Sequence, residues 1–416
     1  MFTRKIFNNK VRLITIPSKD TQAVTVLFLF GVGSRYESKQ INGASHFLEH
    51  LMFKGTKKRP STLAISRELD SVGAEFNAMT SKDYTGYYIK INKDKLELAI
   101  DILSDMLLNS VFKESEINRE RGVIVEEINM YHDNPLMGIE SEFEQEVFKG
   151  NTLSYDVAGP ASVIKNISRR QLLDYKQKHY RPDNVVVAVA GKFDAGVNNL
   201  IQKYFVDKLK SVNHPKEEFA QFILRQKQTR VRIKYKNTKQ MQLALGFPAF
   251  GLHDDRKYVL NVLSVILGGN MSSRLFINVR ERKGLAYFVR CYPNYYQDTG
   301  NIMIQAGLDP ARKDEAVQVI LDELRKVKKR GVTAKELKDS VEFLNGKTVL
   351  NLEDSSHLAE FYAKQELLNN KILTPSQKLR KFKAVTRNDI KKVANEVFRD
   401  ELLTVAGIGP INKINI

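Results

Sequence analysis

The stretch that decides how this chain folds and what it carries is His46-Phe47-Leu48-Glu49-His50, which lies inside residues 42–56, NGASHFLEHLMFKGT. The apolar residues of this segment recur at helical spacing, and Gly55 is suited to end a helix. Residues four apart lie on the same face of a helix, so His46 and His50 are predicted to project together. Two imidazoles in this arrangement can offer nitrogen atoms to one metal ion at about 2.0–2.1 Å, the distance that zinc requires.

The order His-x-x-Glu-His is the inverse of the common zinc-protease signature. Glu49 lies between the two histidines, where a carboxylate can handle a water molecule rather than the metal itself. The chain has 7 histidines and 48 acidic residues among 416, so such a pattern is expected by chance only about 0.01 times. The alternative interpretation is a pair of helix-surface histidines that flank a solvated carboxylate.

Length and composition favour a soluble globular protein with roughly two to three domains. Hydrophobic residues make up 42% of the 416 residues and charged residues 27%. No run of 18 apolar residues occurs, so we expect neither a transmembrane helix nor a membrane partner. Residues 1–9 lack the apolar core of a secretory signal. The one cysteine, Cys291, allows no intrachain disulfide and no thiolate metal cage, and we therefore expect a cytoplasmic protein.

The formal net charge of +18 raises the question of a nucleic-acid partner. The basic residues are scattered along the chain, however, and the densest run, residues 325–330 (RKVKKR), lies on a predicted helix. Such a run most simply forms a solvated helix face. We therefore expect no nucleic-acid partner.

The order of predicted elements begins again after the middle of the chain. A helix from about 168 leads into the strand Val185–Gly191, and a helix from about 386 leads into a strand at 402–407. Residues 207–227 are polar and contain Pro215, as is typical of a linker. We predict an α+β fold of two homologous domains, residues 1–210 and 228–416, related by internal duplication and joined by a linker at 211–227. Each domain is expected to pack helices on an antiparallel sheet.

A helix predicted at 114–131, ended by Asp133-Asn134-Pro135, offers candidates for a third metal ligand. Catalytic zinc usually has three protein ligands and one open position. The candidates are Glu114, Glu116, Glu120, Glu126 and Glu127. Two of them, Glu120 and Glu127, are seven residues apart and share one helix face, so one could bind the metal while the other orients a ligand. The pattern does not choose between Glu126 and Glu127, and a solvated acidic face is the alternative.

The motif at 46–50, taken with Glu120-Arg121-Gly122-Val123-Ile124-Val125-Glu126-Glu127, resembles the pitrilysin family of metallopeptidases, peptidase family M16. In its short, processing-peptidase-like branch the third ligand follows the second histidine after 76 residues, which falls on Glu127. The resemblance implies that the two histidines and Glu127 bind Zn²⁺. It also implies that Glu49 is the general base and that Glu120 acts on the site without binding the metal.

Two further segments carry this resemblance. Phe76-Asn77-Ala78-Met79-Thr80 is similar to the edge strand where family members hold substrate in extended form, which implies main-chain pairing there and substrate contacts from Asn77 and Ala78. Residues 272–287, SSRLFINVRERKGLAY, resemble the family's Arg/Tyr segment, which implies that Arg280 and Tyr287 bind the substrate carbonyl and stabilise the oxyanion. The alternatives are a strand-end asparagine, a salt-bridging arginine and a packed tyrosine.

The resemblance implies a zinc-dependent endopeptidase that cleaves peptides or unfolded protein segments in an enclosed chamber. In the short subfamily one chain is half of a clamshell, so we expect a homodimer, or a heterodimer with an inactive homologue, in which Arg280 and Tyr287 complete the partner's site. The alternative function is a non-catalytic peptide-binding or structural subunit of an M16-type complex. Such subunits usually lack intact zinc ligands, whereas this chain retains all of them.

Overall fold

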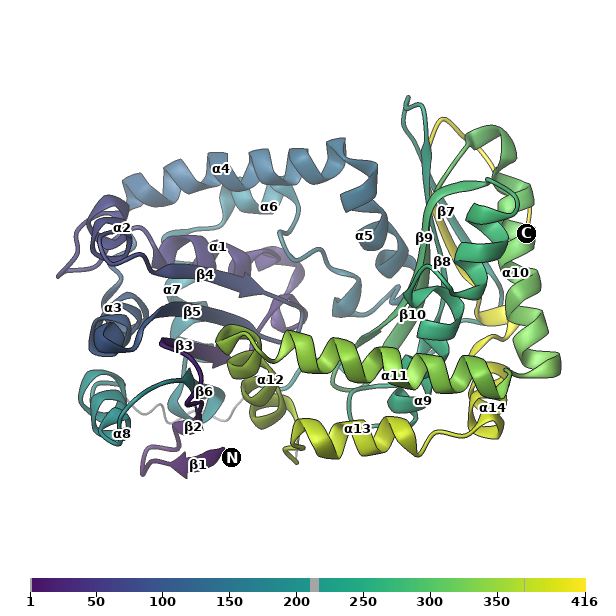
Figure 1. Ribbon diagram of the computed structural model, residues 1–416. Helices are drawn as coiled ribbons and strands as arrows, with labels where there is room; N and C mark the ends of the chain where they lie inside the picture. The colour runs from purple at the N-terminus through teal and green to yellow at the C-terminus, as the bar shows by residue number, and fades with distance from the viewer. Residues whose placement is uncertain (1, 210–216, 370) are drawn as a thin grey trace. The chain divides into compact units, whose positions relative to one another are not determined.

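The computed structural model describes residues 2–209, 217–369 and 371–416, which form two compact units (Figure 1). Unit 1 contains the described residues of 1–128, 155–220 and 349–372, and unit 2 those of 129–154, 221–348 and 373–416. The predicted linker at 211–227 lies partly outside the described residues. Its described part, residues 217–227, contains no helix or strand.

Within the described residues, unit 1 is built on a six-stranded sheet with the order β1-β2-β6-β3-β5-β4. Its neighbouring strands are antiparallel except β2 and β6, which run parallel. The elements are β1 (Thr3–Ile6), β2 (Arg12–Pro17), β3 (Ala23–Phe30), α1 (Ala44–Met52), α2 (Thr62–Asp70), β4 (Glu75–Thr80), β5 (Thr85–Asn92), α3 (Leu96–Asn109), α6 (Ala161–Asn166), α7 (Arg169–His179), β6 (Val185–Gly191), α8 (Val197–Ile201) and α12 (Ser355–Leu368). The helix α4 (Glu114–Asp133) begins in unit 1.

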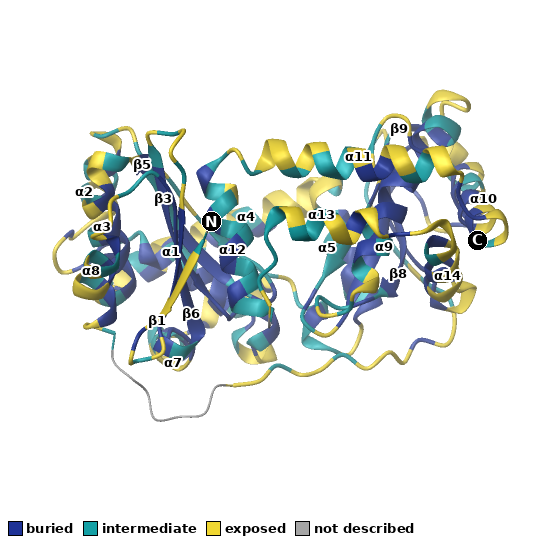
Figure 2. Ribbon diagram, turned by 60° about the horizontal axis from the view of Figure 1, so that its bottom comes forward, coloured by how far each residue is buried: buried dark blue, intermediate teal, exposed yellow. Residues whose placement is uncertain are grey.

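Strand β3 is apolar along almost its whole length because both faces of its sheet are covered (Figure 2). Val26 and Phe28 belong to a core that also contains buried residues of α1, α3 and α7. Leu27 and Leu29 belong to a second core, which includes Ala359 and other residues of α12. The sheet is therefore the middle layer of unit 1, and α1 is fixed to one of its faces.

Unit 2 has, within the described residues, a five-stranded sheet with the order β7-β11-β8-β10-β9. Its elements are α5 (Pro135–Val147), β7 (Arg230–Tyr235), β8 (Met241–Ala249), α9 (Arg256–Ser264), β9 (Ala286–Tyr295), β10 (Gly300–Leu308), α10 (Lys313–Arg330), α11 (Ala334–Asn351), α13 (Pro375–Lys383), α14 (Arg387–Val397) and β11 (Thr404–Gly409). The last turn of α11 belongs to unit 1. One core packs β8 and β10 against α9, α10 and α14, and a second packs the other face against α5.

The two sheets repeat one topology, as expected for a duplicated α+β fold. In unit 1, β2 runs parallel to β6, and the sheet continues through antiparallel β3, β5 and β4. In unit 2, β7 runs parallel to β11, and the sheet continues through antiparallel β8, β10 and β9. The expectation of purely antiparallel sheets is wrong for this one pair in each unit, because the last strand returns from a long helical connection and enters beside the first.

Two helices pack in the other unit from the one to which the predicted continuous segments assign them. Helix α5, from the first half of the sequence, packs on β8 and β11 of unit 2, and α12, from the second half, packs on β3 and β6 of unit 1. The compact units therefore differ from the predicted segments 1–210 and 228–416. Residues 129–154 belong to unit 2 rather than unit 1, and residues 349–372 belong to unit 1 rather than unit 2. The boundaries of the duplicated domains stay a prediction.

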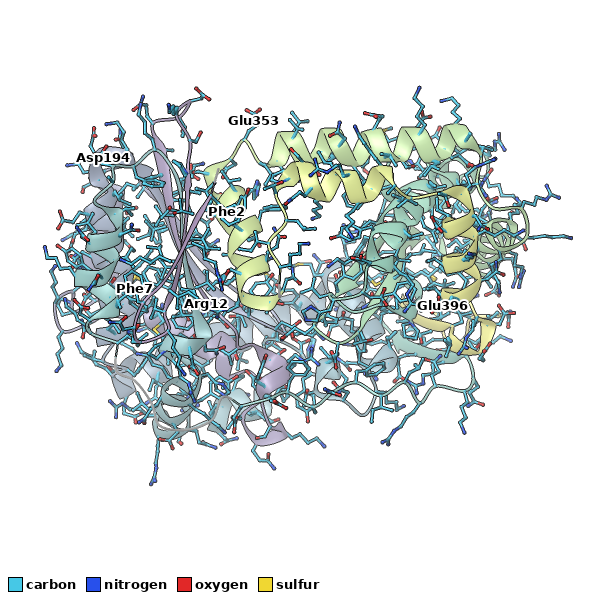
Figure 3. All side chains as sticks on the ribbon, turned by 90° about the horizontal axis from the view of Figure 1, so that it is seen from below. Phe2, Phe7, Arg12, Asp194, Glu353 and Glu396 are labelled. Carbon is cyan, nitrogen blue, oxygen red and sulfur yellow. The ribbon has the colours of Figure 1, made fainter. Side chains whose placement is uncertain are left out.

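Charged side chains cover the outside of both units, and Asp194, Glu353 and Glu396 illustrate this, since each is exposed and projects from the ribbon (Figure 3). Among the helices of the described ranges, none combines the length and the apolar character that a membrane crossing requires.

Candidate metal centre

Helix α1 presents its two histidines away from the core because its apolar residues face the other way. Phe47, Leu48 and Leu51 are buried in the core of unit 1. Gly55, with φ of 117°, allows the chain to turn after the helix in a left-handed conformation that suits glycine. The predicted helix and its shared histidine face are therefore both present.

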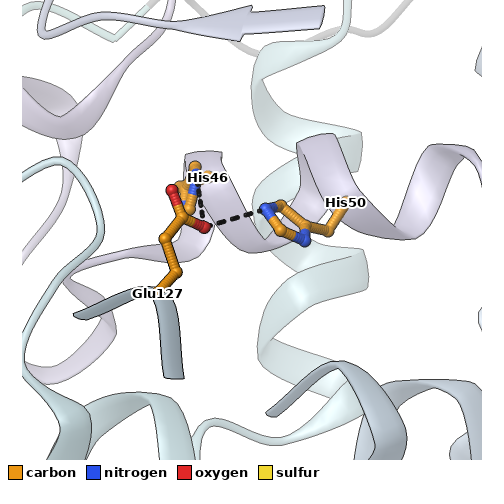
Figure 4. A group of neighbouring side chains, drawn as sticks. All are labelled: His46, His50 and Glu127. Atoms are coloured by element: carbon orange, nitrogen blue, oxygen red, sulfur yellow. Dashed lines mark ion pairs between the residues drawn. The ribbon is translucent and has the colours of Figure 1, made fainter. Parts of the chain in front are cut away.

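Three side chains converge at this helix: His46 and His50 from α1, and Glu127 from α4 (Figure 4). The Nε2 atom of His46 lies 3.6 Å from Oε2 of Glu127, and the Nε2 atom of His50 lies 3.5 Å from the same oxygen. A tetrahedral ion with bonds of 2.0–2.1 Å separates its ligand atoms by about 3.3 Å. The spacing therefore fits one zinc-sized ion, and no other such trio of His, Cys, Asp and Glu side chains was found in the described ranges.

The structure distinguishes the two glutamates between which the sequence pattern could not choose. Glu126 is exposed, whereas Glu127 is half-buried and points at the histidines. The adjacent residues differ in this way because successive positions on a helix are about 100° apart. Neither Glu114 nor Glu116, at the start of α4, belongs to the group.

Glu120 lies on the same face of α4 as Glu127, two turns earlier. It is buried and contacts the Nδ1 atom of His50. Its Oε2 lies 3.1 Å from Nδ1 of His50, and its Oε1 accepts a bond of 2.7 Å from Nζ of Lys54. Burial raises the pKa of Glu120, but the hydrogen bonds from His50 and Lys54 outweigh it, so the pKa is lowered. With Nδ1 held by a carboxylate, Nε2 of His50 is left to face Glu127. Lys54 was missed in the sequence, although its position four residues after His50 is a signal for a shared face.

The two histidines have opposite protonation preferences without a metal. Burial and the neighbouring charge of His50 hold the pKa of His46 well below its usual value. Burial also lowers the pKa of His50, but hydrogen bonds to Glu120 and Glu127 outweigh it and raise the pKa to about 9. The Nδ1 atom of His46 is buried without a hydrogen-bond partner among the described residues. The carboxylates of Glu120 and Glu127 thus hold a positive charge on His50, beside the ammonium group of Lys54 that Glu120 also binds.

Glu49 lies beside the three converging side chains and is half-buried. The hydroxyl of Thr80 donates a hydrogen bond to its Oε2. Burial raises the pKa of Glu49, while the bond from Thr80 opposes the shift. A carboxylate with a raised pKa is suited to take and return a proton. Thr80 was missed in the sequence, and its place at the end of the strand next to α1 is the signal that identifies it.

Strand β4, which contains Asn77 and Ala78, is an edge strand with β5 on one side only. Asn77 is exposed, and its Oδ1 accepts a hydrogen bond of 2.9 Å from the backbone N–H of Ala78. An edge strand carries unpaired main-chain groups that another extended chain can pair with. This edge lies on the same unit as the metal ligands, and β4 packs beside α1.

Arg280 and Tyr287 both belong to unit 2 and lie close to each other. Arg280 is in a π-helical segment, Phe276–Glu281, and Tyr287 is on the edge strand β9. The guanidinium carbon lies 5.8 Å from the centre of the tyrosine ring. Tyr287 is 73% exposed, which excludes the alternative of a packed tyrosine. Arg280 is partly exposed. The ion pair described for it is with Glu281, whose Oε1 lies 3.8 Å from its Nε.

The matches with known proteins span almost the whole chain. Residues 12–161 match the family described as insulinase (peptidase family M16), and residues 166–344 match the peptidase M16 inactive domain. An uncharacterized zinc protease, YmxG, of Bacillus subtilis is 34% identical over 96% of this chain and 97% of its own length. A zinc protease of Streptomyces coelicolor is 36% identical over 96% of this chain and 88% of its own length. A crystal structure of a protease from Helicobacter pylori has a TM-score of 0.94 at 26% identity and covers 99% of both chains.

Proposed function

Since this chain belongs to peptidase family M16, we propose that it is a zinc-dependent endopeptidase that cleaves peptides or unfolded protein segments. The observation that carries the proposal is the convergence of His46, His50 and Glu127 at the spacing of a zinc coordination sphere, with Glu49 beside them. A protease is also what the names of the curated relatives describe. The match of residues 166–344 to an inactive domain agrees with a second half that lacks such a group among its described residues.

The proposed mechanism assigns one task to each side chain. Zinc held by His46, His50 and Glu127 would acidify a water molecule and polarise the scissile carbonyl. Glu49 takes the proton of the attacking water and delivers it to the leaving amine, a task that its raised pKa and its bond to Thr80 support. Glu120 holds the ring of His50 in the orientation that the metal needs.

Substrate recognition is proposed to use the free edge of β4, with Asn77 and Ala78, because an extended peptide can add to such an edge by main-chain hydrogen bonds. Pairing of this kind tolerates many sequences and requires an unfolded substrate segment. Arg280 and Tyr287 are proposed to bind the substrate carbonyl and stabilise the oxyanion, which their exposure and their common location support.

The proposal is tested by incubating the protein with an unstructured polypeptide and identifying the products by mass spectrometry. We expect internal cleavages that stop when a chelator removes the metal and resume when zinc is restored. A tightly folded protein of similar length serves as the control and should remain intact. An unstructured polypeptide that is bound but not cut, with zinc present, would instead support the alternative, a non-catalytic peptide-binding or structural subunit.

Zinc binding to the metal-free protein is expected to release one proton from His50 near pH 7.5, and the water that the metal acidifies adds a further fraction. The pKa of His50 is raised to about 9 in the metal-free site, so this histidine is charged at neutral pH and must lose its proton to bind the metal. Affinity for zinc should therefore rise with pH up to about 9 and then level off. Calorimetry in buffers of different ionisation enthalpy measures the proton count, and a count below one would contradict the protonation state assigned to His50.

We further propose that the protein works as a homodimer, with a heterodimer as the other possible assembly. The support is the length of 416 residues, which matches the short branch of the family. Light scattering of the purified chain should give about twice its mass of 47.6 kDa. A single-chain mass at working concentration would contradict the homodimer. Purification from the source cell with a second, related chain would favour the heterodimer.

A further inference from the structure

The metal-binding helix α1 lacks a capping side chain at its own N-terminus. The N-cap residue is Gly43, with φ of 101°, and it makes no side-chain cap. A Cβ atom at this position would lie 2.6 Å from the backbone oxygen of Ala158 and from Cδ1 of Ile164. Both the backbone conformation and the lack of space exclude the Ser, Thr, Asp or Asn that usually caps a helix. The N–H groups of the first turn must therefore find their acceptor elsewhere.

That acceptor is Glu37, six residues upstream of the cap. Its Oε2 accepts a hydrogen bond of 2.7 Å from the N–H of Gly43, and its Oε1 accepts one of 2.7 Å from the N–H of Ser45. The side-chain amide of Asn42 donates a third bond, of 2.9 Å, to Oε2. Glu37 is only 2% exposed. A buried carboxylate is tolerated only when hydrogen-bond donors surround it. The three donors here all lie at the N-terminal end of α1.

Glu37 itself is held on a fixed loop. Two residues earlier, the buried guanidinium of Arg35 pairs with Asp83 at 3.0 Å, in the turn that follows β4. Asn42 also donates a bond of 2.9 Å to the backbone oxygen of Asp156. On its other side, the Ser45 hydroxyl lies 2.9 Å from the Tyr175 hydroxyl of α7. The first turn of α1 is thereby fastened to the sheet and to a neighbouring helix.

We infer that Glu37 is a positioning residue for the proposed zinc site: by capping α1 it fixes the first turn and, with it, His46. Ser45, whose N–H donates the second bond, directly precedes this ligand, so the carboxylate anchors the backbone immediately before His46. Loss of the cap would let the first turn fray and shift the Nε2 atom of His46 relative to Glu127. Glu37 touches neither metal ligand nor Glu49 and acts through the helix. The inference rests on the proposed function.

The test compares the wild-type protein with Glu37→Gln, which keeps the shape of the side chain but turns an amide group toward backbone N–H donors. Burial raises the pKa of Glu37 to about 7, so measurements belong near pH 8, where the wild-type carboxylate is charged. We expect zinc affinity, measured by competition with a chelating dye, to fall about 10- to 100-fold, as for other groups that orient metal ligands. The absorption spectrum of the cobalt-substituted protein should change as well.

A matched control separates positioning from general stability. Ser61→Ala removes the cap of α2, a helix in the same unit that carries no ligand. It should lower the thermal midpoint and leave zinc affinity and the cobalt spectrum unchanged. If Glu37→Gln does not fold, Asn42→Ala removes one of the three donors and should weaken zinc binding to a smaller degree.

Two kinds of failure can be told apart. A wild-type protein that binds no zinc would overturn the proposed function, whatever Glu37 does. A wild-type protein that binds zinc and cleaves, together with a folded Glu37→Gln of unchanged zinc affinity and spectrum, would overturn only the role of Glu37. An unchanged affinity in Asn42→Ala would do the same where Glu37→Gln cannot be prepared.

Discussion

Replacing Glu49 by glutamine is expected to lower the rate of peptide cleavage by about 10²- to 10⁴-fold, the usual contribution of a general acid–base group. Glutamine has the same shape and can accept the hydrogen bond that Thr80 donates to Oε2 of Glu49, so the local geometry should persist. It cannot accept a proton from water at neutral pH. Because Glu49 is not one of the three converging ligand side chains, zinc content should stay at the wild-type value.

The measurement pairs cleavage of a quenched peptide mixture with metal analysis of the same samples. Loss of activity with zinc retained identifies Glu49 as the base rather than as a ligand. Wild-type activity in Glu49→Gln would refute this role. Loss of zinc along with activity would show that Glu49 supports the metal, and the assignment of the ligands would have to change.

Replacing Glu127 by glutamine is expected to weaken zinc binding by about 10²-fold or more and to abolish cleavage at trace zinc. Removing one ligand forfeits a share of a binding free energy of about 10–16 kcal/mol that the whole set provides. The Oε2 atom of Glu127 lies 3.5–3.6 Å from the Nε2 atoms of both histidines and completes the ligand group found among the described residues. The loss should be visible by chelator competition.

The neighbouring Glu126 provides the matched control for this prediction. It is exposed, one position away on the same helix, and carries the same charge. Glu126→Gln should therefore retain zinc affinity and activity. If the two variants bind zinc equally well, the third ligand is not Glu127, and the account of the site would be wrong.

Sequence periodicity predicted where the two histidines lie better than it predicted the packing around them. The spacing of His46 and His50 placed both on one face of α1, because helical periodicity is a local property. The choice of Glu127 over Glu126 needed either the family resemblance or the structure. Ile117, Ile124 and Ile128 form the buried face of α4, but the exposed apolar residues Val123 and Met130 obscure that face in the sequence. Helical spacing puts Lys54 near His50, whereas the contact of Thr80 with Glu49 depends on the packing of β4 beside α1.

Helices α5 and α12 were not predicted from the sequence, because the residues that begin α5 and those that α12 buries give ambiguous signals. In the sequence, Pro135 indicates the end of the helix at 114–131, whereas in the structure it is the first residue of α5, with Asn134 as the cap. Proline is suited to both places, because its missing N–H is no loss in the first turn of a helix. In α12 the buried face includes Ala359 and Ala363, whose small side chains give little hydrophobic contrast. The exchange of α5 and α12 between units depends on tertiary packing alone.

The assignments that rest on the resemblance stay predictions. The roles of Asn77, Arg280 and Tyr287 toward substrate belong to this group, because they depend on a second molecule, the bound peptide. The cytoplasmic location, which was inferred from the single cysteine and the N-terminal residues, also stays a prediction. The exposure of Tyr287 and the free edge of β4 are what such roles require of the protein itself.

The central claim is that one zinc ion, held by His46, His50 and Glu127, makes the protein a peptidase. The measurement that tests it most directly is a titration of chelator-stripped protein with zinc, with the rate of peptide cleavage recorded at each addition. We expect no cleavage before zinc is added and a linear rise of the rate that ends near one zinc per chain. Cleavage that persists in the stripped protein, or no cleavage at any zinc concentration, would contradict it.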